Sequence, residues 1–174
     1  RQATFPARFQ LVTAMNPCPC GMSGDDSGRC HCSAEQIQRY RNRVSGPLLD
    51  RIDIQVEVLR PKTSILSAST DNIETSESVR ARVIATRQIQ YQRAGRANAL
   101  LSVSDLDRFC KVEGERLRLL EHAAQQLYLS PRACHRILKV ARTIADLEQA
   151  GNIRSTHIAE AISFRQLNSV GAAC

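Results

Sequence analysis

The sequence predicts an α/β fragment followed by an all-α bundle, so that the chain is mainly helical overall. In the first third of the chain, two short segments of strand type flank a loop rich in Cys, Gly and Pro. Beyond a polar stretch rich in Ser and Thr, the spacing of apolar residues changes from a period of two to about three and a half. With 43% hydrophobic residues, 4% aromatic residues and no Trp, the core must be aliphatic and rich in alanine, which favours helices.

Two segments have the pattern of β-strands. Residues 9–15 form a short apolar run that stops at Asn16-Pro17, as expected of a buried strand ended by proline. Residues 52–58 alternate apolar with polar side chains, which is typical of a half-buried strand. Because two strands cannot form a stable sheet with both faces covered, we expect them to be the edge of a larger α/β domain.

The segment between these strands is predicted to be a loop followed by short helices. Residues 17–33 show no periodicity. Ser33, with Gln36 three residues later, predicts a helix that begins with a capping box and runs to Arg43. A Gly-Pro pair then breaks the helix, and a single helical turn is expected at residues 48–51.

The second half of the chain is predicted to be a helical bundle. Ser-Pro and Gly mark helix starts and ends, and apolar residues recur at helical spacing. Helices are expected over residues 76–93 with Ser76 as cap and Gly95 as stop, over 105–109 with Ser104 as cap, over 113–128 with Leu117, Leu120, Ala124 and Leu127 on one stripe, from Ser130-Pro131 to near Gly151 with Ile137, Val140, Ala141, Ile144 and Leu147 on one face, and from Thr156 through Ile158, Ala161, Ile162 and Arg165.

The charge and cysteine content limit the class of partner. A net charge of +7 and a pI of about 9.4 suit a polyanion such as nucleic acid, but a solvated basic surface explains them equally well. No apolar run approaches the ~20 residues needed to cross a bilayer, so no membrane partner is expected. Seven Cys without a visible secretory signal indicate a reducing, cytoplasmic location, in a chain that begins like an interior segment. The same choice between a nucleic-acid surface and a solvated face applies to the arginines of the first bundle helix and its exit, Arg80, Arg82, Arg87, Arg93 and Arg96.

Four cysteines lie close together in the predicted loop. Two of them form a Cys-Pro-Cys motif, and two flank His31 further along; they are Cys18, Cys20, Cys30 and Cys32. Four soft ligands within one short loop suit a structural, tetrahedral Zn²⁺, although one residue between the ligands of each pair is a tighter spacing than usual. His31 is an alternative ligand, and four free thiols are the alternative to metal. Cys110 and Cys134 are expected in or near the core, and Cys174 in the tail.

Three polar residues stand at positions suited to contact a phosphate. Asn16 ends the first predicted strand, where ligands of open α/β sheets bind, although Asn-Pro also suits a plain turn. Arg51 either pairs with the neighbouring Asp50 or Asp53 or offers its guanidinium to a transferring phosphoryl group. Arg132 lies in the first turn of a helix, where a cation is unfavourable without an anion, although a surface arginine is the usual explanation.

The sequence also lacks the parts of a complete nucleotide-hydrolysing site. It has no G-x-x-x-x-G-K-[ST] loop, no strand ending in paired acids that would hold Mg²⁺, and no convincing nucleophile–base pair. The chain is therefore expected to be inactive by itself.

Four segments together resemble the ComM/YifB family of magnesium-chelatase-like AAA+ ATPases. Residues 5–21 are similar to the sensor-1 strand of that family, and residues 45–53 to its arginine-finger segment. Residues 136–147 resemble the lid helix, and residues 158–165 the last helix. The resemblance covers nearly the whole chain. It implies that the α/β fragment is the edge of an AAA+ P-loop sheet and that the helical bundle is the lid.

The resemblance also assigns roles to residues. It implies that Asn16 is sensor 1, which places the water that attacks the γ-phosphate. Arg51 would be the arginine finger, acting on ATP held by a neighbouring subunit. Arg132 is the first candidate for sensor 2, and Arg142 the second. By this resemblance residues 1–60 are the end of the ATPase core with the Cys-rich loop 17–33, followed by a linker over 61–75, the lid over 76–168 and a tail over 169–174.

The cofactors and partners implied by the resemblance belong to a full-length protein. They are ATP and Mg²⁺, a hexameric ring of identical subunits, and DNA, with the activity of a branch-migration helicase in natural competence. Structural Zn²⁺ follows from the cysteines. One alternative is a zinc-stabilised nucleic-acid-binding module without enzymatic activity. Another is a purely helical interaction domain.

Overall fold

The structure, a computed structural model, describes residues 3, 9–24, 28–58 and 74–165. The chain separates into two compact units, residues 1–45 and 46–174. Among the described residues, no helix combines the length and the hydropathy that crossing a bilayer requires.

The first unit holds the Cys-rich loop and helix α1 (Ala34–Arg41). The predicted capping box is confirmed, because the Gln36 amide donates to Ser33 Oγ over 3.2 Å and the Ser33 amide donates to Gln36 Oε1 over 3.0 Å. The helix ends two residues before the predicted Arg43, with Asn42 as its C-cap. Arg41 Nε donates to the Pro17 carbonyl oxygen over 3.3 Å, which ties the helix to the start of the loop.

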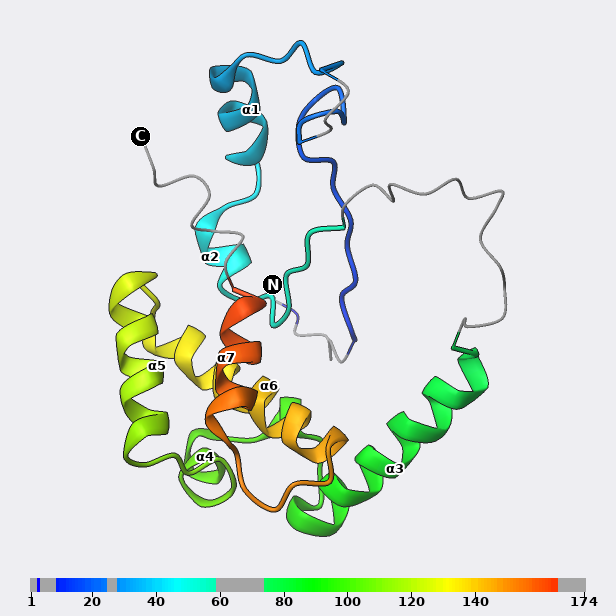
Figure 1. Cartoon of the computed structure of the whole chain (residues 1–174), viewed down its shortest axis with the longest axis vertical. Coiled ribbons are helices and arrows are strands. Elements are labelled where there is room, and N and C mark those ends of the chain that lie inside the picture. The colour runs from blue at the N-terminus through cyan, green and yellow to red at the C-terminus, as the bar shows by residue number, and fades with distance from the viewer. Residues whose placement is uncertain (1–2, 4–8, 25–27, 59–73, 166–174) are drawn as a thin grey trace. The chain divides into compact units, whose positions relative to one another are not determined.

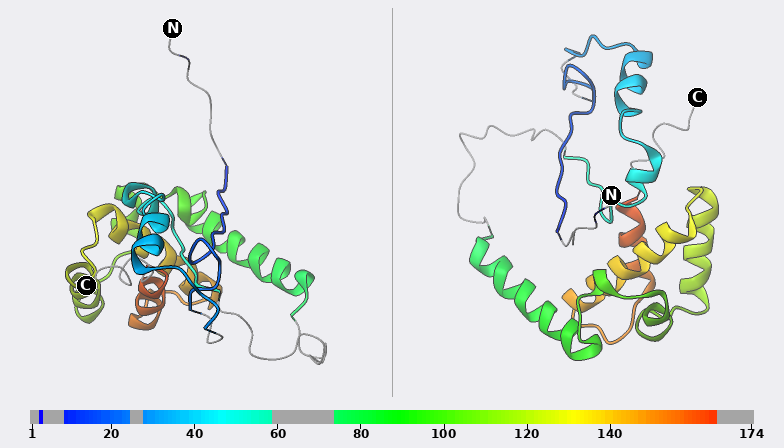
Figure 2. Two further views of the ribbon diagram at one scale, coloured as in Figure 1. Left: turned by 90° about the horizontal axis from the view of Figure 1, so that it is seen from above. Right: turned by 180° about the vertical axis from the view of Figure 1, so that it is seen from behind.

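The second unit is a helical bundle built around one central helix. Its long helix α6 packs against α7, α3, α4 and a 3₁₀ turn, and α5 packs against α7 (Figure 1). Figure 2 shows that the last turns of α3 lie by the bundle while its N-terminal end extends away from it. The elements are α2 (Gly46–Leu49), α3 (Ser76–Ala94), η3 (Asn98–Leu100), α4 (Val103–Phe109), α5 (Glu115–Gln126), α6 (Pro131–Leu147) and α7 (Ser155–Ser163).

The core of the bundle is aliphatic, as the composition indicates. Helix α6 begins as predicted, with Ser130 as N-cap and Pro131 in the first turn. Its predicted face contributes Ile137, Ala141 and Ile144 to the core, together with side chains from α4, α5 and α7. Those partners, with the loops between the helices, include Leu101, Leu106, Cys110, Leu120, Ala123, Ile153, Ile158, Ala161 and Ile162.

Three predicted helix starts were wrong by one or two residues. Thr75 rather than Ser76 accepts from the Ser78 amide at the start of α3. Ser102 rather than Ser104 caps α4, because only Ser102 forms the reciprocal capping box with Asp105. Helix α7 begins before the predicted cap Thr156. Its N-cap is Arg154, whose amide donates to Nδ1 of His157 over 3.0 Å.

Helix α5 is shorter than the predicted 113–128. Gly114 precedes it with φ of 59°, a left-handed value that favours glycine, so the helix cannot begin at residue 113. On the predicted stripe Leu120 is buried, but Leu117 is 39% exposed, and Ala123 rather than Ala124 is the buried alanine.

The predicted strands are not strands within the part of the chain that the structure describes. Residues 9–16 and 52–58 carry no strand assignment there, so the described residues show a mainly helical chain. The Gln55 amide donates to the Phe164 carbonyl oxygen over 3.0 Å, which ties the second segment to the end of α7 instead of to a ladder. A strand requires a backbone partner. The α/β edge therefore stays a prediction, and residues 59–73, which hold most of the expected linker, lie outside the described residues, as do 166–174 with Cys174.

Candidate functional site

The fold brings the four loop cysteines together. Their Sγ atoms all lie within 4.8 Å of one another. Cys18 Sγ lies 3.3 Å from Cys20 Sγ and 3.9 Å from Cys30 Sγ, and Cys20 and Cys30 are 3.6 Å apart. Zn–S bonds of 2.3 Å in a tetrahedron place the sulfurs about 3.8 Å apart, so this set fits Zn²⁺.

The pKa values of the cluster's thiols also suit a bound cation. Burial alone would raise the pKa of Cys18, but hydrogen bonds from Cys20, the Ser23 amide and Cys30 lower it to about 6. At Cys32 a backbone hydrogen bond from Cys20 lowers the pKa, while the Cys20 side chain, burial and the charge of Cys18 raise it to about 11. Four thiolates repel one another unless a cation neutralises them.

Asn16 lies beside this loop within the first unit. Its side chain is exposed. A turn follows it, in which the Gly21 amide donates to the Cys18 carbonyl oxygen over 3.0 Å and Gly21 has φ of 77°. The left-handed φ favours glycine at this position, and a Cβ atom there would make an ordinary contact with Asn16 Nδ2 at 3.5 Å, so the turn lies next to the amide. Asn16 belongs to the first unit, whereas the three arginine candidates, Arg51, Arg132 and Arg142, belong to the second.

Arg51 is exposed in the turn that follows α2 and has no carboxylate partner among the described residues. Its NH1 donates to the Pro47 carbonyl oxygen over 2.9 Å. The hypothesis that Arg51 pairs with Asp50 or Asp53 is wrong: Asp50 accepts from Ser130 Oγ over 3.2 Å, and Asp53 accepts from Arg136. Both neighbouring acids are therefore engaged with the bundle, and the guanidinium of Arg51 keeps most of its donors.

Arg132 is also exposed, in the first turn of α6. Within the described residues its guanidinium has no hydrogen bond or ion pair. A cation at this end of a helix is unfavourable without an anion, so its position suits an anionic ligand.

Arg142, the second candidate for the same role, is held inside the bundle. Its side chain is 4% exposed and pairs with Asp146 over 3.0 Å. It also donates to the carbonyl oxygens of Ala150 over 2.6 Å and of Gly151 over 3.0 Å. The i,i+4 spacing of Arg142 and Asp146 is a sequence signal for this pair that the prediction did not use.

The sequence did not predict that Arg165 and Gln55 share a hydrogen-bond acceptor. Arg165 is 2% exposed, and its NH1 donates to the Leu49 carbonyl oxygen over 3.4 Å. Gln55 Nε2 donates to the same oxygen over 3.2 Å. Burial lowers the pKa of Arg165 despite the nearby negative charge of Asp53. Apolar periodicity predicted Arg165 in line with the inner face of the last helix, and it lies two residues after the end of α7. A contact between residues so far apart in sequence has no local signal.

The arginines proposed as a nucleic-acid surface are mostly paired. Arg82 pairs with Glu74 over 2.6 Å, Arg93 with the buried Asp146 over 2.6 Å, and Arg96 lies 3.8 Å from Asp105. Arg80 and Arg87 are exposed without such a partner among the described residues. The arrangement favours a solvated, internally paired helix over a continuous basic track.

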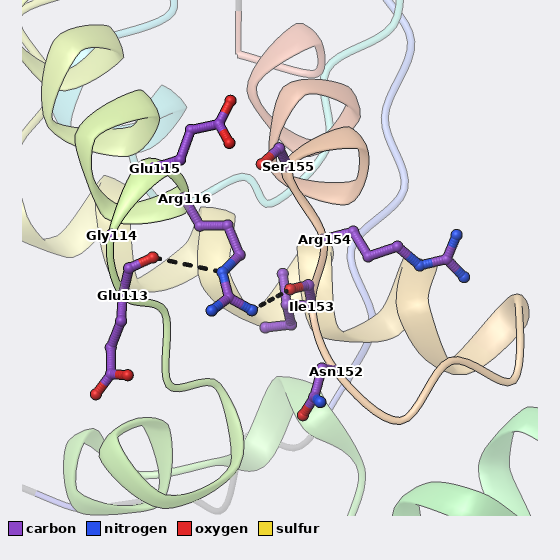
Figure 3. A pocket seen from close by; sticks show the side chains of 8 residues that line it. All are labelled: Glu113, Gly114, Glu115, Arg116, Asn152, Ile153, Arg154 and Ser155. Atoms are coloured by element: carbon purple, nitrogen blue, oxygen red, sulfur yellow. Dashed lines mark hydrogen bonds between the residues drawn. The ribbon is translucent and has the colours of Figure 1, made fainter.

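An open pocket of about 520 Å³ lies between the start of α5 and the start of α7. Arg116 crosses it and donates to the carbonyl oxygens of Glu113 over 3.4 Å and of Ile153 over 3.1 Å (Figure 3). Figure 3 shows the side chains of Glu113 and Arg154 pointing away from Arg116. Arg116 therefore clamps the two loops, and the pocket gathers no set of catalytic groups.

Comparison with known proteins finds two family models, one over the first part of the chain and one over the helical bundle. Residues 73–165 match the family model described as magnesium chelatase, subunit ChlI C-terminal, and residues 1–66 match that of magnesium chelatase, subunit ChlI. The chain therefore belongs to the magnesium chelatase subunit ChlI family.

Individual relatives confirm the resemblance to ComM and YifB. The chain is 46% identical over 165 residues to the uncharacterized protein YifB of Escherichia coli (strain K12), an alignment that covers 95% of this chain and 32% of YifB. It is 48% identical over 164 residues to competence protein ComM of Haemophilus influenzae, covering 94% and 32%, and 44% identical over 165 residues to YifB of Salmonella typhimurium, covering 95% and 32%. The chain thus spans about a third of the length of these relatives.

Proposed function

We propose that this chain supplies the end of the core and the lid of a magnesium-chelatase-like AAA+ ATPase. In this proposal Asn16 is sensor 1, Arg51 is the arginine finger and Arg132 is sensor 2. ATP and Mg²⁺ are held by parts of the full-length protein that precede this chain. Residues 9–16 and 52–58 complete the sheet of that core.

The proposal depends mainly on the hydrogen-bond partners of Arg51. Arg93 and Arg142 donate to Asp146, and Arg136 donates to Asp53, whereas among the described residues Arg51 donates to a single backbone carbonyl oxygen. A guanidinium with free donors binds phosphoryl oxygens in a bidentate manner and neutralises the charge that develops during phosphoryl transfer. Because the neighbouring acids are engaged elsewhere, they do not compete with phosphate for Arg51.

Arg132 is favoured over Arg142 as sensor 2. The donors of Arg142 are taken up by Asp146 and by two backbone carbonyl oxygens, so binding phosphate would leave a buried carboxylate short of partners. Arg132 is exposed and binds an anion without that loss.

The proposed assembly is a ring of identical subunits, a hexamer, in which each finger completes the site of its neighbour. DNA is the proposed substrate of the motor, in branch migration during natural competence. The support is the net charge of +7 and the similarity to a competence protein. The proposed structural metal is Zn²⁺ on Cys18, Cys20, Cys30 and Cys32, with their sulfur spacing as support.

Mixed rings test the finger most directly. In the full-length protein, Arg51→Ala should lower ATP turnover by about 10³–10⁵-fold, the contribution of such fingers. Arg87→Ala, an exposed arginine on α3, is the matched control. At an ATP concentration so far below the KM of Arg132→Ala that this variant is itself nearly inactive, mixing Arg51→Ala subunits with Arg132→Ala subunits should restore part of the turnover. One subunit of a pair then supplies an intact finger and the other an intact sensor 2. Near-normal turnover of Arg51→Ala, or no recovery in the mixture, would refute the assignment.

The cysteine cluster supports a second candidate, a zinc-stabilised nucleic-acid-binding module. In that case the chain by itself binds DNA with an affinity that falls steeply as salt rises, and removal of the metal abolishes binding. Metal analysis and a salt series of DNA binding separate the two candidates. Absence of both metal and salt-dependent binding would exclude the module.

A further inference from the structure

The turn that carries Arg51 is held by the bundle on both sides. Before Arg51, Ser130 Oγ donates to Asp50 Oδ2 over 3.2 Å. After it, Arg136 NH1 donates to Asp53 Oδ1. The residues that approach from the bundle belong to α6 and its N-cap, so each contact joins the Arg51 turn to the lid.

A third contact holds the backbone of the same turn. The carbonyl oxygen of Leu49 accepts from Arg165 NH1 over 3.4 Å and from Gln55 Nε2 over 3.2 Å. Arg165 follows α7 and is 2% exposed, and two of its guanidinium nitrogens, Nε and NH2, are buried without a partner among the described residues. Burying a cation with so few partners is costly, so its contact with the turn is not an incidental surface pair.

The turn cannot hold its own position. Helix α2 has four residues, far fewer than a helix needs to be stable alone. Within the part of the chain that the structure describes, the side chain of Arg51 bonds only to the Pro47 carbonyl oxygen of that turn, so the position of the turn sets the position of the guanidinium. The contacts with α6 and α7 therefore decide where the guanidinium is presented.

Ser130 joins this junction to Arg132. Its Oγ accepts from the Ala133 amide over 3.2 Å as N-cap of α6, and it donates to Asp50. One hydroxyl thus connects the acid next to Arg51 with the helix turn that holds Arg132.

We infer that Ser130, Arg136 and Arg165 are positioning residues that couple the arginine finger to the lid of its own subunit. This inference rests on the proposed function of Arg51 and Arg132. Nucleotide bound by Arg132 in one subunit holds the lid, and the lid sets the finger that the subunit offers to its neighbour. ATP occupancy at one site then controls hydrolysis at the next.

The Asp53–Arg136 pair gives the sharpest test, since neither residue is assigned a contact with ATP. In the full-length protein, Arg136→Met should lower kcat for ATP by about 10–100-fold, the effect of a small misplacement of a catalytic group, with KM within about twofold of wild type. Arg82→Met is the matched control, because it removes an ion pair between α3 and Glu74, which precedes that helix. The exchange Asp53→Arg with Arg136→Asp should recover at least half of the lost rate on a logarithmic scale.

An unchanged kcat, an equal loss in the Arg82→Met control, or an exchange variant no better than Arg136→Met would overturn the coupling. Hydrogen exchange on this chain alone tests the junction without ATP. The amides of Asp50, Arg51 and Ile52, which close the turn onto Gly46, Leu48 and Leu49, should exchange at least tenfold faster in Arg136→Met.

The two measurements distinguish the ways of failing. Faster exchange with an inactive wild-type protein would reject the proposed ATPase function and, with it, the coupling, while leaving the junction itself established. Unchanged exchange with an active wild-type protein would reject the coupling and leave the finger assignment standing.

Discussion

Replacing Asp146 with alanine should destabilise the helical bundle more than the replacement of an exposed ion-pair residue. The Asp146 carboxylate accepts from Arg93 NH1 and NH2 over 2.6 Å each, from Arg142 Nε over 3.1 Å and from Asn98 Nδ2 over 2.8 Å. The side chain of Asp146 is 0% exposed, and that of Arg142 is 4% exposed. Alanine would therefore leave a buried cation without its counter-charge.

The expected loss in the free energy of unfolding lies at the lower end of the range for a broken buried ion pair. Removing one partner of such a pair costs about 3–5 kcal/mol. Arg142 keeps the carbonyl oxygens of Ala150 and Gly151, and Arg93 keeps Asn98 Oδ1 at 2.8 Å, so we expect about 3 kcal/mol. The second unit, residues 46–174, lies between the sizes for which 1 kcal/mol lowers Tm by about 4–8 °C and by about 2–4 °C, so the expected fall in Tm is about 6–24 °C.

Thermal unfolding followed by far-UV circular dichroism measures the effect. Glu74→Ala is the control, because it removes an ion pair with Arg82 whose side chains are about half exposed. The double variant Arg142→Ala/Asp146→Ala should lose less stability than the sum of the losses of the two single variants, because it contains no unpaired Arg142 cation. If Asp146→Ala melts no lower than the Glu74→Ala control, the network contributes nothing to stability and the assignment of Arg142 to the interior is wrong.

Three further outcomes are expected. Arg142→Ala should lower Tm with little specific effect on KM for ATP, whereas Arg132→Ala should raise KM in the full-length protein without lowering Tm; a melting assay and steady-state kinetics separate them. Cys20→Ser should reduce bound zinc to well below one ion per chain, whereas Cys134→Ser should keep it, as elemental analysis would show. Burial raises the pKa of Cys110 to about 11, so its buried thiol should be alkylated last in the folded chain, as mass mapping of the alkylated cysteines would show. Its contribution to the free energy of unfolding should decline as pH rises from the ordinary thiol pKa of 9.0 through about 11, which a comparison of Tm with Cys110→Ser at alkaline pH would show.

Local chemistry explains which elements were predictable. The Ser33–Gln36 capping box, the Ser130-Pro131 start and the Gly95 stop each depend on residues within one turn of one another. Starts were misplaced where several hydroxyl residues compete, as at Thr75 and Ser76, since any of them is a good cap and packing of the helix selects one.

Some features of the candidate site were likewise predictable from short-range sequence, and others were not. The cysteines lie in one loop, so their spacing was enough to predict that they meet. The partners of Arg51 were not predictable, because Asp50 and Asp53 are chemically able to pair with it and instead bind Ser130 and Arg136, some 80 residues further along the chain. The interior position of Arg142 was in principle accessible from its i,i+4 spacing with Asp146.

By itself, the sequence determined the family, the helical character of the second half and the cysteine cluster, because each is encoded in residue type and short-range spacing. The tertiary structure decided which arginines are free. That depends on which carboxylates distant segments bring to each guanidinium: Asp146 takes Arg93 and Arg142, and Asp53 takes Arg136. Arg51 and Arg132 keep their guanidinium donors because, among the described residues, packing of the helices pairs no carboxylate with either of them.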